Sequence, residues 1–268
     1  MSETLLSIEG LGITFGGLKA VNDVGFTVGP GEIVSVIGPN GAGKTTLFNM
    51  ISGIYQPGAG RVVLSGEEVT GMAPNLLARR GMSRTFQNLQ IFPSMTVLEN
   101  VISGHHLKER GPVLADLLNL PASRRRAAAA AEGARALLAR VGLDRAAERE
   151  AASLSYGALK RLEIARALAL SPKILLLDEP AAGCNAVETE EIDHLIAEVA
   201  QSGVAILLVE HDMKMVMRIS NHIVVLDHGE KIAEGDPATI SRDPAVIAAY
   251  LGTDAGTDTG MEADHAEG

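Results

Sequence analysis

Residues 38–46 read Gly-Pro-Asn-Gly-Ala-Gly-Lys-Thr-Thr, which fits the pattern G-x-x-x-x-G-K-[ST] of a phosphate-binding loop. The apolar, β-branched run Ile33-Val34-Ser35-Val36-Ile37 precedes this loop, and Leu47-Phe48-Asn49-Met50-Ile51 follows it. The first run predicts a strand and the second predicts the start of a helix. Because such a loop connects a strand to a helix, both flanks support the motif, and the stretch predicts an α/β core that holds a nucleotide.

The residues of this loop have separate predicted roles. Its glycines allow backbone N–H groups to turn inward around phosphate oxygens, because a Cβ atom would block that approach. The helix that begins near Lys44 adds the positive end of its dipole, and the Lys44 ammonium is expected to reach the β- and γ-phosphates. The Thr45 hydroxyl is a predicted ligand of Mg²⁺. The nucleotide-binding residues predicted in the loop are Gly38, Pro39, Asn40, Gly41, Ala42, Gly43, Lys44, Thr45 and Thr46.

The composition is that of a globular chain without disulfides. Its 268 residues are 46% apolar and 21% charged, and the net charge is −10. An acidic balance argues against a general nucleic-acid-binding surface, which needs clustered Lys and Arg. Cys184 is the only cysteine, so no intrachain disulfide can form. The N-terminus lacks the pattern of a secretory signal, and no run approaches the roughly 18 apolar residues of a membrane span.

The rest of the chain predicts strands and helices in alternation. Leu5–Thr14 and Ala20–Val28 read as antiparallel strands near the start. Ile174–Leu177 and Ala205–Val209 are wholly apolar, as expected of parallel strands buried on both faces. The predicted fold class is therefore α/β with a mostly parallel sheet.

Helical patterns interrupt this alternation between about residues 88 and 153, where we expect a helical subdomain inserted into the core. One of its helices is predicted at Thr96–Ser103, because Thr96 and Glu99 have the spacing of a capping box. A run of three arginines, 124–126, is interpreted as a solvated basic first turn. We expect one domain over residues 1–252 and a disordered acidic tail over residues 253–268.

A second chemical signal lies in Leu175-Leu176-Leu177-Asp178-Glu179-Pro180. A carboxylate at the end of a buried strand, beside a phosphate-binding loop, can hold Mg²⁺ directly or through water, and Asp178 fits that role. Glu179 would point elsewhere as the chain turns into Pro180. It could polarise a water molecule for in-line attack on the γ-phosphate.

A third motif, Leu154-Ser155-Tyr156-Gly157-Ala158, resembles the signature of ATP-binding cassette (ABC) ATPases. Together with the phosphate-binding loop, Asp178-Glu179, Gln87 and His211, the resemblance covers about residues 5–251. It implies a P-loop NTPase (ABC ATPase) core with an N-terminal antiparallel β subdomain and an inserted helical subdomain. It also implies that two cassettes pair head to tail, so that each ATP lies between the phosphate loop of one subunit and the signature of the other.

The resemblance implies further site residues. Ser155 and the backbone of Gly157 would face a partner's γ-phosphate at a helix N-terminus. Gln87 is similar to the Q-loop residue that contacts Mg²⁺ or water, and His211 to the switch histidine that contacts the γ-phosphate. Phe15 is similar in position to the aromatic residue that stacks on adenine. The catalytic set is then Glu179, His211 and Lys44, and the metal set is Thr45, Gln87 and Asp178.

Two positions depart from the family pattern. The signature usually has Gln where this chain has Ala158, and the D-loop, here Ala182-Gly183-Cys184-Asn185, usually ends in Asp. Ser155 and Gly157 remain, so we expect an active site. We interpret Cys184 as a small packing residue at the dimer seam and not as a nucleophile.

Further segments resemble the larger ATPase of branched-chain amino acid importers: Arg84-Thr85-Phe86-Gln87-Asn88, Met95 to Val101, Arg161 to Arg166 and Glu179 to Gly183. The resemblance implies a cassette peripheral to the cytoplasmic side of the cell membrane. It would pair with a second cassette, identical or different, on membrane-spanning permeases fed by a solute-binding protein. ATPases of urea or amide importers and of lipopolysaccharide export remain alternatives.

Two readings outside transport also stay open. A soluble ABC protein that acts on ribosomes or DNA is disfavoured by the single cassette and the acidic composition. A phosphate-loop kinase would have an acceptor site and no signature motif.

Overall fold

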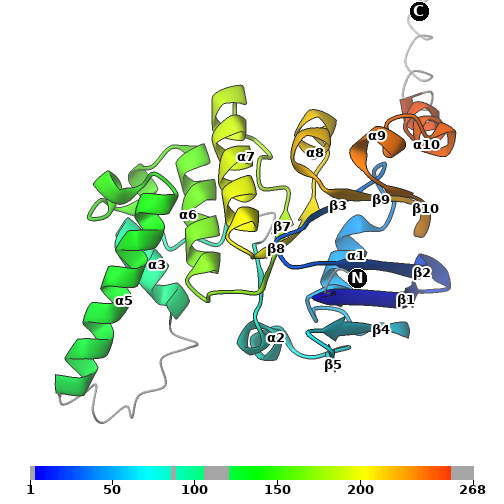
Figure 1. Cartoon of the computed structure of the whole chain (residues 1–268). Helices are drawn as coiled ribbons and strands as arrows, with labels where there is room; N and C mark the ends of the chain where they lie inside the picture. Colours follow the sequence, from blue (N-terminus) through cyan, green and yellow to red (C-terminus); the bar gives the residue numbers. More distant parts are fainter. Residues whose placement is uncertain (1–3, 86–88, 106–120, 255–268) are drawn as a thin grey trace, which may run out of the picture.

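Two β-sheets carry the fold (Figure 1). The computed structural model describes residues 4–85, 89–105 and 121–254. The larger sheet has the strand order β10-β9-β3-β8-β7-β6. Its strands are β3 (Ile33–Ile37), β6 (Met82–Arg84), β7 (Ile174–Asp178), β8 (Ala205–Val209), β9 (His222–Asp227) and β10 (Glu230–Gly235). Only the β9–β10 pair is antiparallel, so the predicted mostly parallel sheet is confirmed.

The smaller sheet is antiparallel and has the order β2-β1-β4-β5. Its strands are β1 (Leu6–Phe15), β2 (Leu18–Val28), β4 (Ala59–Leu64) and β5 (Glu67–Glu68). The first two strands match the predicted pair, and Gly16 and Gly17 form the turn between them with positive φ angles. The strand β4 begins at Ala59, which pairs with Gly12 of β1.

Nine helices and two short 3-10 helices are found in the described residues. They are α1 (Lys44–Ile51), α2 (Pro74–Arg80), α3 (Val97–His105), α5 (Pro121–Arg140), α6 (Tyr156–Leu168), α7 (Ala186–Gln201), α8 (Met213–Ile219), α9 (Pro237–Ile240), α10 (Pro244–Asp254), η1 (Asp144–Ala146) and η2 (Ala151–Ser153). None of the helices in this part of the chain is long and apolar enough to cross a membrane.

The large sheet has hydrophobic cores on both of its faces, because successive side chains of a strand point to opposite faces. Leu176 of β7 packs with α1 and the small sheet. Its neighbours Leu175 and Leu177 pack on the other face with residues of α3, α5, α6 and α7. The strands β3, β7 and β8 are buried along their whole length, as their apolar sequences predict. The carboxyl ends of these strands, where the site is expected, are therefore fixed by cores on both faces.

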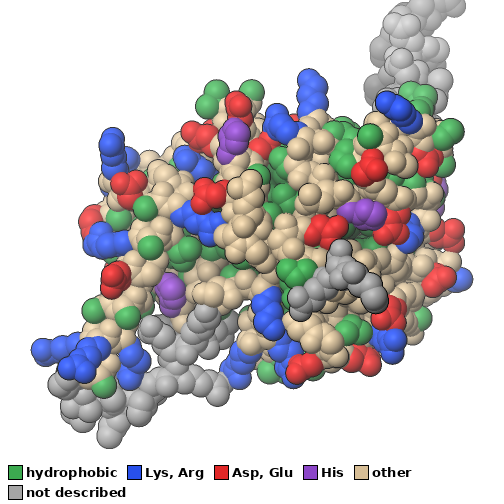
Figure 2. All heavy atoms as spheres, in the orientation of Figure 1, with side chains coloured by type: hydrophobic (Ala, Val, Ile, Leu, Met, Phe, Trp, Pro, Cys, Tyr) green, Lys and Arg blue, Asp and Glu red, His purple; other side chains and the backbone are tan. Residues whose placement is uncertain are grey.

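Helices α3 and α5 lie in the predicted insertion and pack with α6 at one end of the molecule, on the left in Figure 1. Figure 2 shows basic side chains gathered at the lower left of that face, over the start of α5, where Arg124, Arg125 and Arg126 are found. The final helix α10 extends to Asp254 and so includes the first two residues of the predicted tail. The rest of the predicted tail, residues 255–268, lies outside the described residues.

Candidate active site

The phosphate-binding loop connects β3 to α1, as predicted, and two of its glycines have no possible substitute. Gly38 has a φ of 149°, and a Cβ atom there would lie 2.0 Å from the Leu226 carbonyl oxygen. Gly43 has a φ of 98°, and its Cβ would lie 2.6 Å from the Ala20 carbonyl oxygen. Both positions therefore require glycine for conformation and for space. The strand β9 and the hairpin strand β2 thus hold the loop from two sides.

Lys44 is folded back into this loop. Its Nζ donates to the carbonyl oxygens of Gly38 at 2.7 Å and Pro39 at 2.9 Å, and the residue is 7% exposed. Burial lowers the pKa of Lys44, and the nearby charge of Glu179 acts in the opposite direction. The ammonium is thus held by acceptors that phosphate oxygens can replace when a nucleotide binds.

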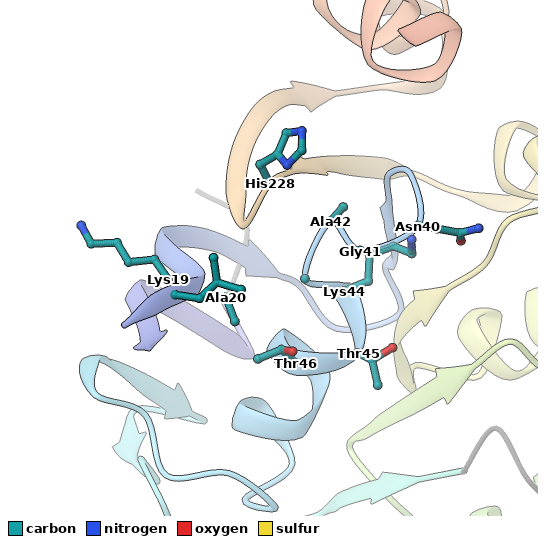
Figure 3. Close-up of a pocket in the computed structure, with 11 residues that line it drawn as sticks. Lys19, Ala20, Asn40, Gly41, Ala42, Lys44, Thr45, Thr46 and His228 are labelled. Carbon is teal, nitrogen blue, oxygen red and sulfur yellow. The ribbon is translucent and has the colours of Figure 1, made fainter. Parts of the chain in front are cut away.

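A cavity of about 400 Å³ opens over the loop (Figure 3). It is lined by Leu18, Lys19, Ala20, Asn40, Gly41, Ala42, Gly43, Lys44, Thr45, Thr46 and His228. Seven of the nine predicted loop residues, from Asn40 to Thr46, therefore line this cavity. Leu18, Lys19, Ala20 and His228 are additional: they come from β2 and from the turn between β9 and β10. Only the adjacency of β9 and β3 in the sheet brings that turn to the loop.

Asp178 ends the buried strand β7, and it is paired with Arg84 at the end of β6. The two side chains are 4% and 8% exposed, and Arg84 Nη2 lies 2.8 Å from Asp178 Oδ2. Arg84 Nη1 also donates to Asn49 Oδ1 and Ser52 Oγ of α1 and its end. Arg84 thus connects the predicted metal-binding carboxylate to the helix that follows the phosphate loop.

Glu179 and His211 contact each other. His211 Nε2 lies 2.6 Å from Glu179 Oε1, and the two side chains are 50% and 12% exposed. These residues follow the neighbouring strands β7 and β8, whose parallel pairing brings their carboxyl ends together. The structure therefore brings together two of the three predicted catalytic side chains, whose roles remain predictions.

Glu210 was not predicted as a site residue, yet its carboxylate connects the two loops that carry Glu179 and His211. Its Oε1 accepts from the Ala181 N–H at 3.0 Å, and its Oε2 accepts from the His211 N–H at 3.0 Å. Burial raises the pKa of Glu210, while these backbone N–H groups favour the charged form. The buried Glu210 carboxylate therefore positions the backbone near both predicted catalytic residues. Its place in the sequence, directly before His211, could have indicated this role.

The signature motif begins α6. Ser155 is the N-cap residue, and its Oγ accepts from the Ala158 N–H at 3.3 Å. We call the Ser155 hydroxyl and the Gly157 N–H the signature cradle. Neither residue lines the cavity over the phosphate loop. Both donate instead to Glu188 of α7, another residue that the sequence did not single out.

The two departures from the family pattern have structural roles. The methyl group of Ala158 is buried, 7% exposed, in the core that includes α3 and α6. Asn185 is the N-cap of α7, where its Oδ1 accepts from the N–H groups of Val187 and Glu188, both at 3.0 Å. Cys184 packs partly buried against the same core, and burial raises the pKa of its thiol. This agrees with a packing residue and disfavours a reactive thiolate.

Phe15, the predicted adenine-stacking residue, does not line the cavity over the loop. Phe15 is 47% exposed, packs edge to face on Tyr55 with ring centroids 5.5 Å apart, and lines a neighbouring hollow with Lys19. Gln87 lies outside the described residues, so its predicted contacts with metal or water stay predictions.

The described donors suit Mg²⁺. The Thr45 hydroxyl and the Asp178 carboxylate are the hard oxygen ligands that this ion prefers. In the described ranges there is no cluster of three or more His, Cys, Asp or Glu side chains that could hold a metal ion. Mg²⁺ commonly takes one or two protein oxygens and completes its shell with water and phosphate oxygens. The arrangement fits an ion that arrives with a nucleotide.

Comparison with known proteins gives two family matches. The ABC transporter family matches residues 21–182. A family described as branched-chain amino acid ATP-binding cassette transporter matches residues 230–256. The first range includes the phosphate loop, the signature motif, Asp178 and Glu179.

Three curated relatives span nearly the whole chain. The high-affinity branched-chain amino acid transport ATP-binding protein LivG of Escherichia coli (strain K12) is 47% identical over 253 residues, 94% of this chain and 99% of its own. The corresponding protein BraF of Pseudomonas aeruginosa is 48% identical with the same coverage. The lipopolysaccharide export system ATP-binding protein LptB of Escherichia coli (strain K12) is 32% identical over 249 residues, 93% of this chain and 98% of its own.

Two solved structures share the architecture. The ADP conformation of an ATP-binding cassette of an ABC transporter has a TM-score of 0.82 and 33% identity, and the match covers 94% of this chain and 100% of that one. A dimeric cassette in a post-hydrolysis state, bound to ADP and Pi, has a TM-score of 0.71 and 26% identity, with 87% and 99% coverage.

Proposed function

Because this chain belongs to the ABC transporter family of ATP-binding cassettes, we propose that it hydrolyses ATP to power the import of branched-chain amino acids. One observation supports this substrate above the alternatives. The relatives that are 47–48% identical over 94% of this chain are both named branched-chain amino acid transport ATP-binding proteins. The lipopolysaccharide export relative is 32% identical, so export is the weaker candidate.

The chemistry of the proposed site follows from its side chains. The phosphate loop and Lys44 bind the β- and γ-phosphates, and the Lys44 ammonium leaves the carbonyl oxygens of Gly38 and Pro39 to do so. Glu179 accepts the proton of the attacking water, and the contact with His211 holds its carboxylate in one direction. Mg²⁺ held by Thr45 and Asp178 would neutralise charge on the phosphate oxygens.

The cassette acts as one half of a head-to-tail pair in this proposal. The signature cradle of one chain then serves ATP on the phosphate loop of another, in keeping with its absence from the chain's own loop cavity. A dimeric solved cassette of 26% identity supports such pairing. The second cassette is a copy or a different chain. The pair sits on permease subunits at the cytoplasmic side of the cell membrane, and a solute-binding protein supplies the substrate.

Replacement of Glu179 tests the hydrolytic part of the proposal. Glu179→Gln keeps the shape of the side chain but cannot accept a proton, so ATP hydrolysis should fall about 10²-fold while ATP binding is retained. Hydrolysis and the binding of a fluorescent ATP analogue are measured on the full chain. Glu190→Gln, an exposed change of the same kind on α7, is the control. Normal turnover of Glu179→Gln would remove Glu179 from the role of base.

Transport by the complete system tests the substrate. Membrane vesicles that contain the chain with its cognate permeases and binding protein are given radiolabelled leucine, and ATP-dependent uptake is expected. The Glu179→Gln variant should abolish this uptake. Uptake of urea or a short amide instead of leucine, or ATP-dependent release of lipopolysaccharide, would replace the proposed substrate. ATP hydrolysis that is unchanged by the permeases, with no ATP-dependent movement of any of these solutes, would point to a soluble cassette protein.

A further inference from the structure

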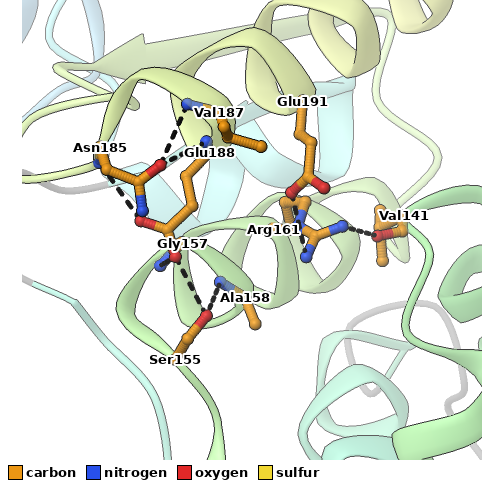
Figure 4. A network of polar contacts seen from close by, with 9 residues as sticks. All are labelled: Val141, Ser155, Gly157, Ala158, Arg161, Asn185, Val187, Glu188 and Glu191. Atoms are coloured by element: carbon orange, nitrogen blue, oxygen red, sulfur yellow. Dashed lines mark hydrogen bonds and ion pairs between the residues drawn. The ribbon is translucent and has the colours of Figure 1, made fainter.

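The signature cradle already holds an anion, the carboxylate of Glu188 (Figure 4). Glu188 Oε1 accepts from the Ser155 hydroxyl at 3.1 Å and from the Gly157 N–H at 3.2 Å. Its other oxygen, Oε2, accepts from the Asn185 N–H at 3.3 Å. One side chain of α7 thus occupies both donors at the start of α6.

Local sequence explains how the carboxylate comes to lie there. Glu188 is the third residue of α7 and forms a capping box with Asn185, which fixes its Oε2. Gly157 leaves room for the rest of the carboxylate, because a Cβ atom at this position would lie 2.5 Å from Glu188 Cδ. A capping box alone needs only the contact with Asn185. The two contacts of Oε1 with α6 are therefore additional to the cap.

The Glu188 carboxylate is negatively charged, as a phosphate group is. Hydrogen bonds from the Asn185 N–H, and also from Ser155 and Gly157, hold the pKa of Glu188 below its ordinary value of 4.5, against desolvation. Glu188 is therefore ionised at neutral pH. Its oxygens accept the same hydroxyl and N–H that a phosphate at a helix N-terminus would accept.

We propose that Glu188 determines how tightly the signature cradle binds a partner's ATP, because its carboxylate competes with the γ-phosphate for the Ser155 hydroxyl and the Gly157 N–H. This inference rests on the proposed function and takes the second cassette to be a copy of this chain, so that the cradle serves ATP bound to that copy. The two anions cannot share the same donors, and they also repel each other. Closure of the pair then requires Glu188 to turn away, so part of the binding free energy of ATP is used to displace it.

The variant Glu188→Gln separates this role from the helix cap. Gln also forms capping boxes, so α7 keeps its start, while the negative charge disappears. The control Glu190→Gln removes the same charge two residues further along α7, where the side chain is exposed and lies 3.9 Å from His194. Pairing of the full chain is measured by light scattering against the concentration of a non-hydrolysable ATP analogue. Binding of a fluorescent ATP analogue is measured on the same samples.

Glu188→Gln is expected to pair with about tenfold higher affinity than the wild type, with unchanged ATP binding to the phosphate loop, while Glu190→Gln behaves as the wild type. A second variant, Glu188→Asp, keeps the charge but is one methylene shorter and cannot span the same distance. It should also pair more tightly, by a smaller factor. Thermal unfolding of each variant establishes that it is folded.

The possible results distinguish this inference from the proposed function. If the chain binds ATP and pairs, but Glu188→Gln pairs no better than Glu190→Gln, the competition is refuted and the proposed function stands. If every variant binds ATP and remains monomeric, the competition is also refuted, because removal of the carboxylate has released no binding site. If the wild-type chain fails to bind ATP, the proposed function fails and this inference falls with it.

Discussion

Glu179 has a backbone conformation that glutamate rarely takes, with a φ of 50° in the left-handed region. Such a conformation costs roughly 1–3 kcal/mol and persists where the surroundings hold it. The Glu179 N–H donates to the Val209 carbonyl oxygen at 2.9 Å, and its own carbonyl oxygen accepts from the Ala182 N–H at 3.2 Å. Lys160 Nζ donates to the same carbonyl oxygen at 3.3 Å. The main chain of the proposed base is thus held by hydrogen bonds to β8, to the loop that follows β7 and to α6.

Lys160 is therefore expected to position Glu179 for hydrolysis. The residue is 2% exposed on α6, and its ammonium also lies 5.8 Å from the centre of the Tyr156 ring. Lys160→Met keeps the length and fills the space, but it removes the donor to Glu179. We expect kcat for ATP hydrolysis to fall about tenfold with little change in KM, because the binding loop is untouched. Steady-state kinetics of the full chain provide the measurement.

A purely structural role of Lys160 would give a different result. The exposed Lys214 of α8 offers a matched control, since Lys214→Met makes the same change of charge and shape away from Glu179. If Lys160→Met lowers the melting temperature but leaves kcat per folded molecule at the wild-type value, Lys160 supports the fold and does not position the base.

Glu210 gives a prediction about pH. Burial raises its pKa above the ordinary value of 4.5, so the folded chain binds this proton more tightly than the unfolded chain does. The free energy of unfolding therefore contains a contribution that is present below pH 4.5 and is lost as the pH rises through the raised pKa. Glu210→Gln, which has no such proton, should show a smaller fall in stability between about pH 4.5 and about pH 8. Urea unfolding at both pH values measures the difference, and an equal fall in both proteins would contradict it.

At the scale of elements, α3 depends on its capping box. Thr96 Oγ1 accepts from the Glu99 N–H at 3.1 Å, and Glu99 Oε2 accepts from the Thr96 N–H at 2.7 Å. Thr96→Ala should lower the free energy of unfolding by about 1 kcal/mol at neutral pH, because an orphan N–H group loses its acceptor. The Thr96 N–H lowers the pKa of Glu99 below 4.5, so the reciprocal bond is lost as the pH falls through that lowered value. Chemical unfolding at neutral and acid pH tests both parts. Equal stability of the two proteins at neutral pH would contradict the role of the cap.

Elements with strong local signals were predictable from the sequence. The capping box predicted α3, and the wholly apolar runs predicted β7 and β8. Elements whose signal is tertiary or very short were missed. The strand β5 has only two residues, Glu67 and Glu68, and forms because β4 offers an edge to pair with. The four-residue helix α9 is capped by Asp236, whose side chain accepts from the Thr239 N–H, a signal too short for periodicity to detect.

The site divides in the same way. Motif residues such as Lys44 and Glu179 could be predicted because their chemistry depends on neighbours in the sequence. Arg84, His228 and Glu188 could not, because each reaches the site through a contact between distant segments: β6 with β7, β9 with β3, and α7 with α6. The spacing of residues in the sequence does not indicate such contacts. They depend on which strands and helices become neighbours in the fold.

At the scale of the whole molecule, the segment before α3 presents apolar side chains to solvent. Phe92 and Met95 are 48% and 39% exposed. The fully buried Asn100 fixes this segment, because its Oδ1 accepts from the Phe92 N–H at 2.9 Å and its Nδ2 donates to the Phe92 carbonyl oxygen at 3.0 Å. Arg166 of α6 lies 5.6 Å from the centre of the Phe92 ring. A rigid, exposed apolar surface at the start of the helical insertion suits a protein partner.

We therefore expect the permease subunits to contact this surface, where the insertion follows the Gln87 segment. In a Cys184→Ser background, which removes the only native cysteine, Met95→Cys should form crosslinks to a permease in membranes that contain the complete transporter. Glu230→Cys, on the edge strand β10, should not. Both variants should retain ATP hydrolysis when purified, since neither residue lines the cavity over the phosphate loop. Crosslinks of equal yield from both positions, or from Glu230→Cys alone, would place the membrane partner on another face. The coupling of hydrolysis to transport would then have to pass through the core and not through the helical insertion.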